Sequence, residues 1–454
     1  MSYTSIDLFS GPGGICTGFK WAGIKPLIAV EFSYWTTQTY KSTHNADIFP
    51  LEDYLNGQLE NSDEFFKPSD KTLLIYGDVR LVSNDLIMEI LAKRFNTDTV
   101  DIVTGGAPCE SFSMQGDRKE DDERNNLFLN IVRIARSVNS KMVLFENVKG
   151  LLSKKSQGIS GKMFEDICDE FERIDGKTGG SYKLASRNAK EVLLKASDYG
   201  VPQNRERIFL VGINSKYEAQ YTYPEITHGP EGDKPYVTVK DALFDLPQID
   251  FGQVSEVYDF NFDNIQEQHR SEFVRCMRGV NTFIPDHLDY DISTTISSHK
   301  AINHTEKMRK RMHLILQGES MKTAVDRLLL EGKENDVKEF FPNKIFGSRN
   351  RRLREDQPCF TVTSHCLDEM IHPNFDRGLT PREAARLQSF PDWYQFEGHY
   401  VKFHSDPEQD RYEQIGDAIP PLMAFALGKQ VVKSLEEIQS ISEIKIGEVE
   451  LIKN

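Results

Sequence analysis

The sequence predicts an α/β protein built on a doubly wound, mostly parallel sheet, followed by a smaller and less regular domain. Two observations support this fold class. Short apolar runs alternate with longer amphipathic segments through the first half of the chain, and this alternation fades after Asn214. Strand–helix alternation is typical of a parallel sheet that helices cover on both faces.

Five apolar runs in the first half are predicted to be strands, in this order: Ser5–Phe9, Leu27–Val30, Leu73–Tyr76, Val100–Thr104 and Met142–Phe145. Before the fifth run, Leu127–Val138 carries apolar residues at helical spacing. Two later strands are expected at Val192–Ala196 and Ile208–Ile213, on either side of a loop rich in Gly, Pro, Asn and Arg. A closing helix is expected over Pro420–Ile438, with prolines at its start.

A chain of 454 residues is long enough for two or three domains. We expect a regular first domain over residues 1–213 and an irregular second domain over 214–400. The remaining segment, 401–454, is expected to return to the first domain. Basic patches at Arg309–Arg311 and Lys344–Arg354 mark the second domain.

Composition excludes several classes of protein. With 55 basic and 70 acidic residues the net charge is −15, which argues against a small basic protein that coats DNA but leaves room for a local basic cleft. No run reaches the roughly 18 apolar residues of a membrane helix, and the N-terminus lacks a secretory signal. We therefore expect a cytoplasmic protein that contacts no membrane.

The six cysteines are scattered without a C-x-x-C pair, so neither a disulfide framework nor a zinc ribbon is predicted. One group of cysteines and histidines, Cys359, His365, Cys366 and His372, has no standard zinc spacing. No metal site is expected.

Candidate ligand-binding residues follow the predicted strands, because ligands of open α/β sheets bind outside the carboxyl ends of the strands. A Gly-rich turn, Ser10–Gly14, follows the first strand, but Cys16 stands where the dinucleotide fingerprint needs its third glycine. Glu31 follows the second strand and suits a ribose diol, and Asp78 follows the third and suits an adenine amino group. This pocket fits S-adenosylmethionine better than a dinucleotide.

Candidate catalytic residues follow the later strands. Cys109 lies on a Gly-Pro turn and is a candidate nucleophile, and Glu146 is a candidate acid. Arg205 and Arg207, two residues apart on an extended chain, are expected to point the same way and to grip a base or lower the pKa of a thiol. Each residue alone has an ordinary structural explanation, but their conjunction around a nucleoside pocket indicates catalysis.

Six segments, in order, resemble the motifs of the DNA (cytosine-5) methyltransferase family, prokaryotic restriction–modification type. They are Asp7–Gly14, Gly106–Cys109, Glu146–Val148 (ENV), Gln203–Arg207 (QxRxR), Arg377–Gln388 (RxLTxREAARLQ) and Gly416–Pro421 (resembling GNAVPP). The resemblance spans nearly the whole chain. It departs from the family at Ala107 and Glu110, where Pro and Gln are common, and at Asp417, where Asn is usual.

The resemblance implies a Rossmann-like fold that uses S-adenosylmethionine as methyl donor and leaves S-adenosylhomocysteine. It places Phe9 and Phe32 against the adenine, Glu31 on the ribose and Asp78 on the adenine amino group. The implied cofactor-binding set is Phe9, Gly11, Gly13, Gly14, Glu31, Phe32, Asp78, Val79, Pro108 and Asp417.

The resemblance also implies a mechanism. The Cys109 thiolate adds to C6 of a cytosine flipped out of duplex DNA, Glu146 acts at N3, and Arg207 with Arg205 holds the O2 edge. C5 then takes the methyl group. The polar segment Glu110–Asn126 suits a loop that closes over the target.

By the same resemblance, residues 214–400 form the target-recognition domain. Candidates for contacts to phosphates are its basic residues Arg309, Lys310, Arg311, Lys344, Arg349, Arg351, Arg352 and Arg354. The expected partners are duplex DNA, bound by a monomer, and a cognate restriction endonuclease or phage-defence subunits.

Two alternatives stay open. One is a tRNA cytosine-5 methyltransferase, against which the broad second domain and its basic patches argue. The other is a non-catalytic, methyltransferase-like DNA-binding module, although Cys109, Glu146 and the Gly-rich turn are all present.

Overall fold

The computed structural model describes residues 3–107, 126–156, 158–176, 180–255, 265–279, 296–402 and 408–453. The chain divides into two compact units. Unit 1 consists of Met1–Lys195, Glu206–Glu225 and Met423–Asn454, and unit 2 of Ala196–Arg205 and Ile226–Leu422. The chain thus leaves unit 1 twice and returns to it twice, and the loop before Glu206 belongs to unit 2.

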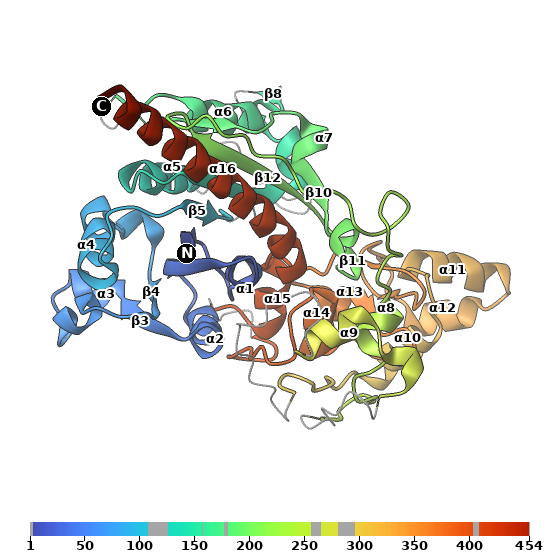
Figure 1. Ribbon diagram of the computed structural model, residues 1–454. Coiled ribbons are helices and arrows are strands. Elements are labelled where there is room, and N and C mark those ends of the chain that lie inside the picture. The colour runs from blue at the N-terminus through green and yellow to red at the C-terminus, as the bar shows by residue number, and fades with distance from the viewer. Residues whose placement is uncertain are drawn as a thin grey trace. The chain divides into compact units, whose positions relative to one another are not determined.

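Unit 1 is built on a sheet with the strand order β10-β12-β6-β5-β1-β2-β4-β3, and β9 also pairs with β12 (Figure 1). The strands are β1 (Tyr3–Leu8), β2 (Ile24–Glu31), β3 (Ala46–Pro50), β4 (Thr72–Tyr76), β5 (Ile102–Gly105), β6 (Met142–Val148), β9 (Tyr182–Leu184), β10 (Leu193–Lys195) and β12 (Glu206–Asn214). Strands β1 to β6 pair in parallel, whereas β12 runs antiparallel to β6, β9 and β10. The predicted α/β class, with a mostly parallel sheet, is confirmed.

Helices flank this sheet. They are α1 (Gly14–Trp21), α2 (Tyr34–His44), α3 (Leu51–Leu55), α4 (Asn84–Phe95), α5 (Phe128–Ser137), α6 (Lys162–Glu172), α7 (Ala189–Val192) and α16 (Pro421–Lys453), with short 3-10 helices at Ser62–Phe66, Val79–Leu81 and Lys149–Ser153. A small hairpin joins β7 (Lys155–Ser156) to β8 (Ile159–Ser160). Among the described helices, none is both long and apolar enough to cross a membrane.

Both faces of the sheet are buried, as side chains along single strands show. In β2, Ile28 and Val30 belong to one apolar cluster, while Ala29 between them packs with Cys16 and Tyr40 in another. Successive strand residues point to opposite faces. Helices α4, α5 and α6 contribute to the first cluster, and α1 and α2 to the second.

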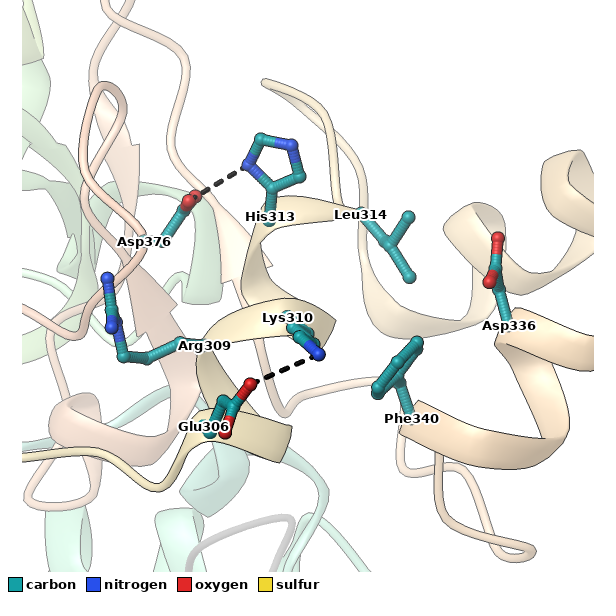
Figure 2. Close-up of a pocket in the computed structure, with 8 residues that line it drawn as sticks. All are labelled: Glu306, Arg309, Lys310, His313, Leu314, Asp336, Phe340 and Asp376. Carbon is teal, nitrogen blue, oxygen red and sulfur yellow. Dashed lines mark hydrogen bonds and ion pairs between the residues drawn. The ribbon is translucent and has the colours of Figure 1, made fainter.

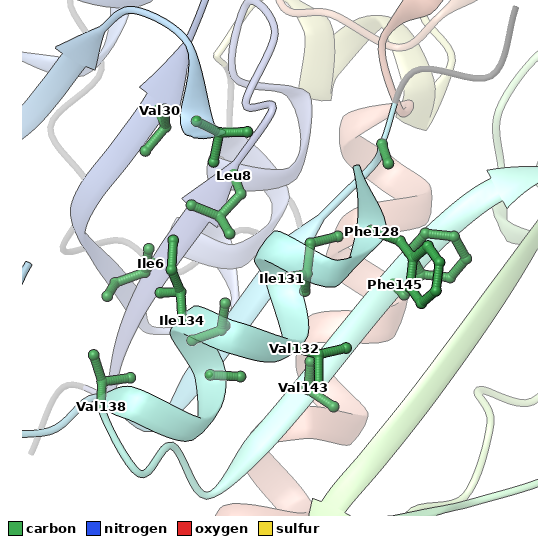
Figure 3. Packing of buried hydrophobic residues seen from close by; sticks show 14 of the residues in the cluster. Ile6, Leu8, Val30, Phe128, Ile131, Val132, Ile134, Val138, Val143 and Phe145 are labelled. Carbon is green, nitrogen blue, oxygen red and sulfur yellow. The ribbon is translucent and has the colours of Figure 1, made fainter. Parts of the chain in front are cut away.

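The amphipathic segment around residue 130 is the helix expected there, observed as α5. Its residues Ile131 and Ile134, and Val138 directly after it, are fully buried with Ile6 of β1 and Val143 of β6 (Figure 3). This packing fixes the helix against the strands that lead into the candidate site.

Unit 2 is made of short elements. They are a 3-10 turn (Ala196–Tyr199), β11 (Gln203–Asn204), α8 (Val239–Leu243), a 3-10 turn (Glu267–His269), α9 (Glu272–Met277), α10 (Glu306–His313), α11 (Met321–Leu330), α12 (Glu334–Phe340), β13 (Arg351–Arg352), β14 (Cys359–Phe360), α13 (Cys366–Glu369), β15 (Met370–Ile371), α14 (Pro381–Leu387) and α15 (Arg411–Asp417). Helix α14 falls within the RxLTxREAARLQ segment.

That segment holds unit 2 together through buried ion pairs. Arg386 is fully buried and binds the carboxylates of Asp245 and Asp392. Arg377 is equally buried and binds Glu383, whose side chain also completes a capping box at the start of α14. Buried charges are tolerated only when they are paired and hydrogen-bonded, so this motif stabilises the unit 2 fold.

Candidate active site

The candidate site lies in unit 1, where parallel strands β1, β2, β4, β5 and β6 end at the same edge of the sheet. The sequence-predicted residues of unit 1 follow or terminate these strands. The Gly-rich turn follows β1, Glu31 ends β2, Asp78 follows β4, Gly106 follows β5, and Glu146 lies near the end of β6.

The Gly-rich turn bends sharply at the end of β1. Phe9, Gly11 and Gly13 have left-handed backbone conformations, with φ of 56°, 55° and 99°. The Ser10 amide donates to the carbonyl of Val30 at 3.0 Å, which anchors the turn on β2. A Cβ atom at Gly11 would meet nothing within 4 Å, so the left-handed backbone rather than crowding favours glycine there.

The Glu31 carboxylate is fixed by backbone amides. Its Oε2 accepts from the Gly11 amide at 2.9 Å, and its Oε1 accepts from the amides of Phe32 and Ser33 at 2.9 and 2.8 Å. Burial raises the pKa of Glu31, while these hydrogen bonds lower it. A carboxylate has about four acceptor positions, so Glu31 retains capacity for a ligand hydroxyl.

Apolar side chains are left uncovered beside Glu31. Phe32 is 68% exposed, and Tyr34 is also exposed. Large exposed apolar groups gathered at one place mark a binding surface. Val79 differs, because its side chain is buried in the core.

Asp78 is engaged by Arg80. The Arg80 amide donates to Oδ1 at 2.9 Å, and its Nη2 donates to Oδ2 at 2.6 Å. These hydrogen bonds lower the pKa of Asp78. Arg80 is not among the site residues predicted from the sequence. Its position two residues after Asp78 is the feature that could have predicted this ion pair.

Glu146 forms a largely enclosed ion pair with Arg207. Its Oε1 lies 3.1 Å from Nε of Arg207 on β12, and both side chains are largely buried. A Cβ atom at Gly106 would lie 2.8 Å from Oε2 of Glu146, so any side chain there would displace this carboxylate. The neighbouring Asn147 donates from Nδ2 to the carbonyl of Ala107 at 3.3 Å. These contacts fix the segment that leads to Cys109.

Three of the sequence predictions lie outside the described residues. They are Pro108, Cys109 and the segment Glu110–Asn126, of which only Asn126 is described. Ala107, whose carbonyl accepts from Asn147, is the described residue nearest to the predicted nucleophile in sequence.

Arg205 and Arg207 have different partners, in different units. Arg205 is fully buried in unit 2, where Nη1 donates to the carbonyl of Val362 at 2.8 Å. Asp417 also belongs to unit 2, at the exposed end of α15, and accepts from Nε2 of Gln409 at 3.0 Å.

The basic candidates of unit 2 fall into two groups. Arg352 is buried and donates to the carbonyls of Ile315 and Met312, each at 2.6 Å, and Arg311 donates to the carbonyl of Phe340 at 2.8 Å. These two guanidinium groups therefore bind backbone carbonyls of unit 2.

The other candidates are more accessible: Lys310, Lys344, Arg349 and Arg354 are exposed, and Arg309 and Arg351 are half-buried. Arg309 stacks on the ring of Phe251 and Arg351 on that of Phe360, each at 3.5 Å from the ring centroid, and Arg354 pairs with Asp356.

Unit 2 also holds an open pocket between α10 and α12 (Figure 2). It is lined by Glu306, Arg309, Lys310, His313, Leu314, Asp336, Phe340 and Asp376. Some of its polar side chains are already paired, since Lys310 lies 3.1 Å from Glu306 and Nδ1 of His313 lies 2.9 Å from Asp376. The pocket therefore offers donors and acceptors together rather than a purely basic surface.

Comparison with known proteins agrees with this geometry. The family model of the C-5 cytosine-specific DNA methylases matches residues 3–77 and 63–433. The chain is similar to the Type II methyltransferase M.DdeI of Desulfomicrobium norvegicum, with 31% identity over 97% of this chain and 91% of that protein. It is also similar to the Type II methyltransferase M1.HphI of Haemophilus parahaemolyticus, with 29% identity over 95% of this chain and 87% of that protein.

A solved structure agrees as well. The crystal structure described as a DNA modification methyltransferase encoded within an E. coli prophage matches with a TM-score of 0.65 and 25% identity, covering 96% of this chain and all of that one. The chain therefore belongs to the C-5 cytosine-specific DNA methylase family and is a DNA cytosine-5 methyltransferase.

Proposed function

We propose that this enzyme methylates C5 of a specific cytosine in duplex DNA, with Cys109 as nucleophile and with Glu146 and Arg207 acting on the flipped-out base. The observation that carries the proposal is the largely buried Glu146–Arg207 pair. It lies against Gly106, three residues before Cys109, at the edge of the sheet where the cofactor residues gather.

The methyl donor proposed is S-adenosylmethionine, in keeping with the family and fold. The residues present suit it. Exposed Phe32 offers a surface for the adenine, Glu31 retains an acceptor for a ribose hydroxyl, and the Asp78 carboxylate suits the exocyclic amino group. The left-handed turn at Gly11 and Gly13 lets the backbone approach the methionine part closely. When bound, this cofactor supplies an electrophilic methyl group.

The proposed chemistry begins with addition of the Cys109 thiolate to C6 of cytosine, which forms an S–C6 bond and makes C5 nucleophilic. Glu146 donates a hydrogen bond or proton at N3 as negative charge develops on the ring. Arg207 holds the Glu146 carboxyl group and faces the O2 edge. After C5 is methylated, its proton leaves and the S–C6 bond breaks, which restores the aromatic ring.

Unit 2 is proposed to recognise the DNA sequence. Contacts to phosphates are proposed for the accessible cations among the predicted set, which are Arg309, Lys310, Lys344, Arg349, Arg351 and Arg354. Arg311 and Arg352 are assigned a role in the fold, because they bind backbone carbonyls. Arg205 and Asp417 are assigned contacts within unit 2, to the carbonyl of Val362 and to Gln409.

The biological setting proposed is a restriction–modification system, since relatives of this chain are named Type II methyltransferases. In that setting the enzyme acts in the bacterial cytoplasm as a monomer on DNA, alongside a cognate restriction endonuclease.

Covalent trapping tests the proposal. Duplex oligonucleotides carrying 5-fluorocytosine are incubated with the enzyme and S-adenosylmethionine, and a denaturation-resistant adduct is sought. Fluorine cannot leave C5 as a proton does, so the expected result is an adduct that disappears in Cys109→Ser. A set of duplexes then identifies the target sequence. Trapping of tRNA instead of duplex DNA would favour the RNA enzyme, and no adduct with either would favour a binding module.

A further inference from the structure

A cluster of buried polar side chains lies beneath the Gly-rich turn of unit 1, and the proposed mechanism gives it no role. We call it the Asp7 cluster; its members are Asp7, Cys16, Thr17, Tyr40, His44 and Thr104. Each is at most 3% exposed. Polar groups are costly to bury unless they are hydrogen-bonded, so their gathering at this place needs an explanation.

The carboxylate of Asp7 joins three segments of the site. Its Oδ1 accepts from the hydroxyl of Thr104 at 2.5 Å, and its Oδ2 accepts from the thiol of Cys16 at 3.1 Å. Asp7 lies on β1 two residues before Phe9, and Thr104 lies on β5 two residues before Gly106. One side chain thus links the strand entering the Gly-rich turn, the helix leaving it, and the strand that leads toward Cys109.

The other members of the Asp7 cluster, Thr17, His44 and Tyr40, are linked by hydrogen bonds to the Gly-rich turn or to Cys16. The hydroxyl of Thr17 donates to the carbonyl of Gly13 at 2.9 Å and lies 3.5 Å from Nε2 of His44. The hydroxyl of Tyr40 donates to the sulfur of Cys16 at 3.1 Å. Cys16 therefore donates on one side and accepts on the other, which accounts for a polar side chain where the dinucleotide fingerprint has glycine.

Burial and hydrogen bonding have opposite effects on the pKa of Asp7. Burial raises the pKa of Asp7 to about 6, and the hydrogen bonds from Thr104 and Cys16 oppose that rise. Burial also raises the pKa of Glu31, and the charge of Asp7 adds to that effect. The carboxylate is thus electrostatically linked to the residue proposed to hold the ribose.

We propose that Asp7, with Cys16 and Thr104 as its donors, is a positioning residue for methyl transfer. It fixes the Gly-rich turn relative to the segment that carries Cys109, so that cofactor and nucleophile are held in one geometry. This inference rests on the proposed function, because it assumes that the turn binds the cofactor and that Cys109 attacks the base.

Paired variants test the inference. Thr104→Val removes the hydroxyl while keeping the shape, and Thr104→Ser restores a hydroxyl; Cys16→Ala and Cys16→Ser form a second pair in case one site does not tolerate change. Thr72→Val is the matched control, since the hydroxyl of Thr72 is also buried in this sheet but bonds the carbonyl of Pro26. For each folded variant, the measurements are Tm, the Kd for S-adenosylhomocysteine, kcat and the KM for DNA.

We expect Thr104→Val and Cys16→Ala to weaken S-adenosylhomocysteine binding and lower kcat by about tenfold each, the size expected for one lost hydrogen bond to a charged group. The KM for DNA should stay unchanged, and the Ser variants should recover most of both losses. Thr72→Val should lower Tm without changing the Kd or kcat.

Wild-type cofactor affinity and kcat in Thr104→Val and Cys16→Ala would overturn the inference, as would a change in the KM for DNA equal to that in the Kd. If the unchanged enzyme binds no S-adenosylhomocysteine and traps no 5-fluorocytosine, the proposed function fails and the inference falls with it. Failure of the inference alone leaves the unchanged enzyme active.

Discussion

Two carboxylate–arginine pairs lie at the carboxyl edge of the unit 1 sheet, and they are built differently. Glu146 and Arg207 come from neighbouring strands, and their side chains are only 12% and 14% exposed. Asp78 and Arg80 are two residues apart after β4, and the Arg80 side chain is 58% exposed. One pair is enclosed by the fold, whereas the other extends into solvent.

The difference in burial implies that the Glu146–Arg207 pair is fixed, whereas a ligand can replace Arg80 in the Asp78–Arg80 pair. An exposed ion pair contributes about 0–1 kcal/mol, so a ligand can replace it at little cost. A buried pair is weakly stabilising overall, but removing one partner leaves a charge buried without compensation, at roughly 3–5 kcal/mol. We therefore infer that Glu146 and Arg207 form a preset part of the site, and that Arg80 can release Asp78 to a ligand amino group.

The largest expected effect is that of Glu146→Gln. Glutamine keeps the size and an acceptor for Arg207 but supplies no acid, so kcat should fall about 100-fold or more, within the range for general acid catalysis. Binding of S-adenosylhomocysteine should be unchanged. Single-turnover methylation of a cognate duplex measures the catalytic rate, and a titration with S-adenosylhomocysteine measures binding.

The control for that prediction is Glu206→Gln. Glu206 is the neighbour of Arg207 in sequence, but its side chain is 40% exposed and pairs with Lys149 at the surface. It should keep nearly full activity. A kcat for Glu146→Gln within a few-fold of the unchanged enzyme would remove Glu146 from the mechanism and make the buried pair a structural feature.

A smaller effect is expected for Asp78→Asn. The amide offers one acceptor oxygen and no charge, so the affinity for S-adenosylhomocysteine should fall about tenfold, as for the loss of a hydrogen bond to a charged group. Asp85→Asn, an exposed position at the start of α4, serves as the control and should bind normally. If both variants bind equally well, the adenine amino group is recognised elsewhere.

The sequence was sufficient to predict the strands that end at this site, because each is a compact apolar run. Leu73–Tyr76, for example, was predicted within one residue of β4. The edge strand β3 escaped prediction, since Ala46–Pro50 is short and includes Asp47 and a proline. Since ligand-facing residues follow strand ends, placing the strands also placed Glu31, Asp78 and Glu146 at one edge.

Partners of these side chains could not be predicted in the same way. Alternation puts residues two apart on one face only within a single strand. Here β11 ends at Asn204 and β12 begins at Glu206, so Arg205 lies between the two strands while Arg207 lies on β12. Charge alone does not tell whether a guanidinium faces solvent or binds carbonyls, as Arg352 does. Such contacts depend on packing between segments far apart in sequence.

The smallest effect is expected for Arg80→Ala, and it tests the exchangeable pair most directly. At neutral pH the affinity for S-adenosylhomocysteine should stay within about twofold or improve slightly, because an exposed pair costs little to break. At acidic pH the unchanged enzyme and the Arg80→Ala variant should differ in their affinity for S-adenosylhomocysteine. Arg80 lowers the pKa of Asp78, so the unchanged enzyme keeps this carboxylate ionised as the pH falls, whereas Asp78 in Arg80→Ala takes up its proton at a higher pH. Cofactor affinity measured from neutral to acidic pH should therefore begin to decline earlier in the variant. A tenfold loss already at neutral pH would instead mean that Arg80 contacts the cofactor itself, and the exposed pair would then be as much a part of the site as the buried one.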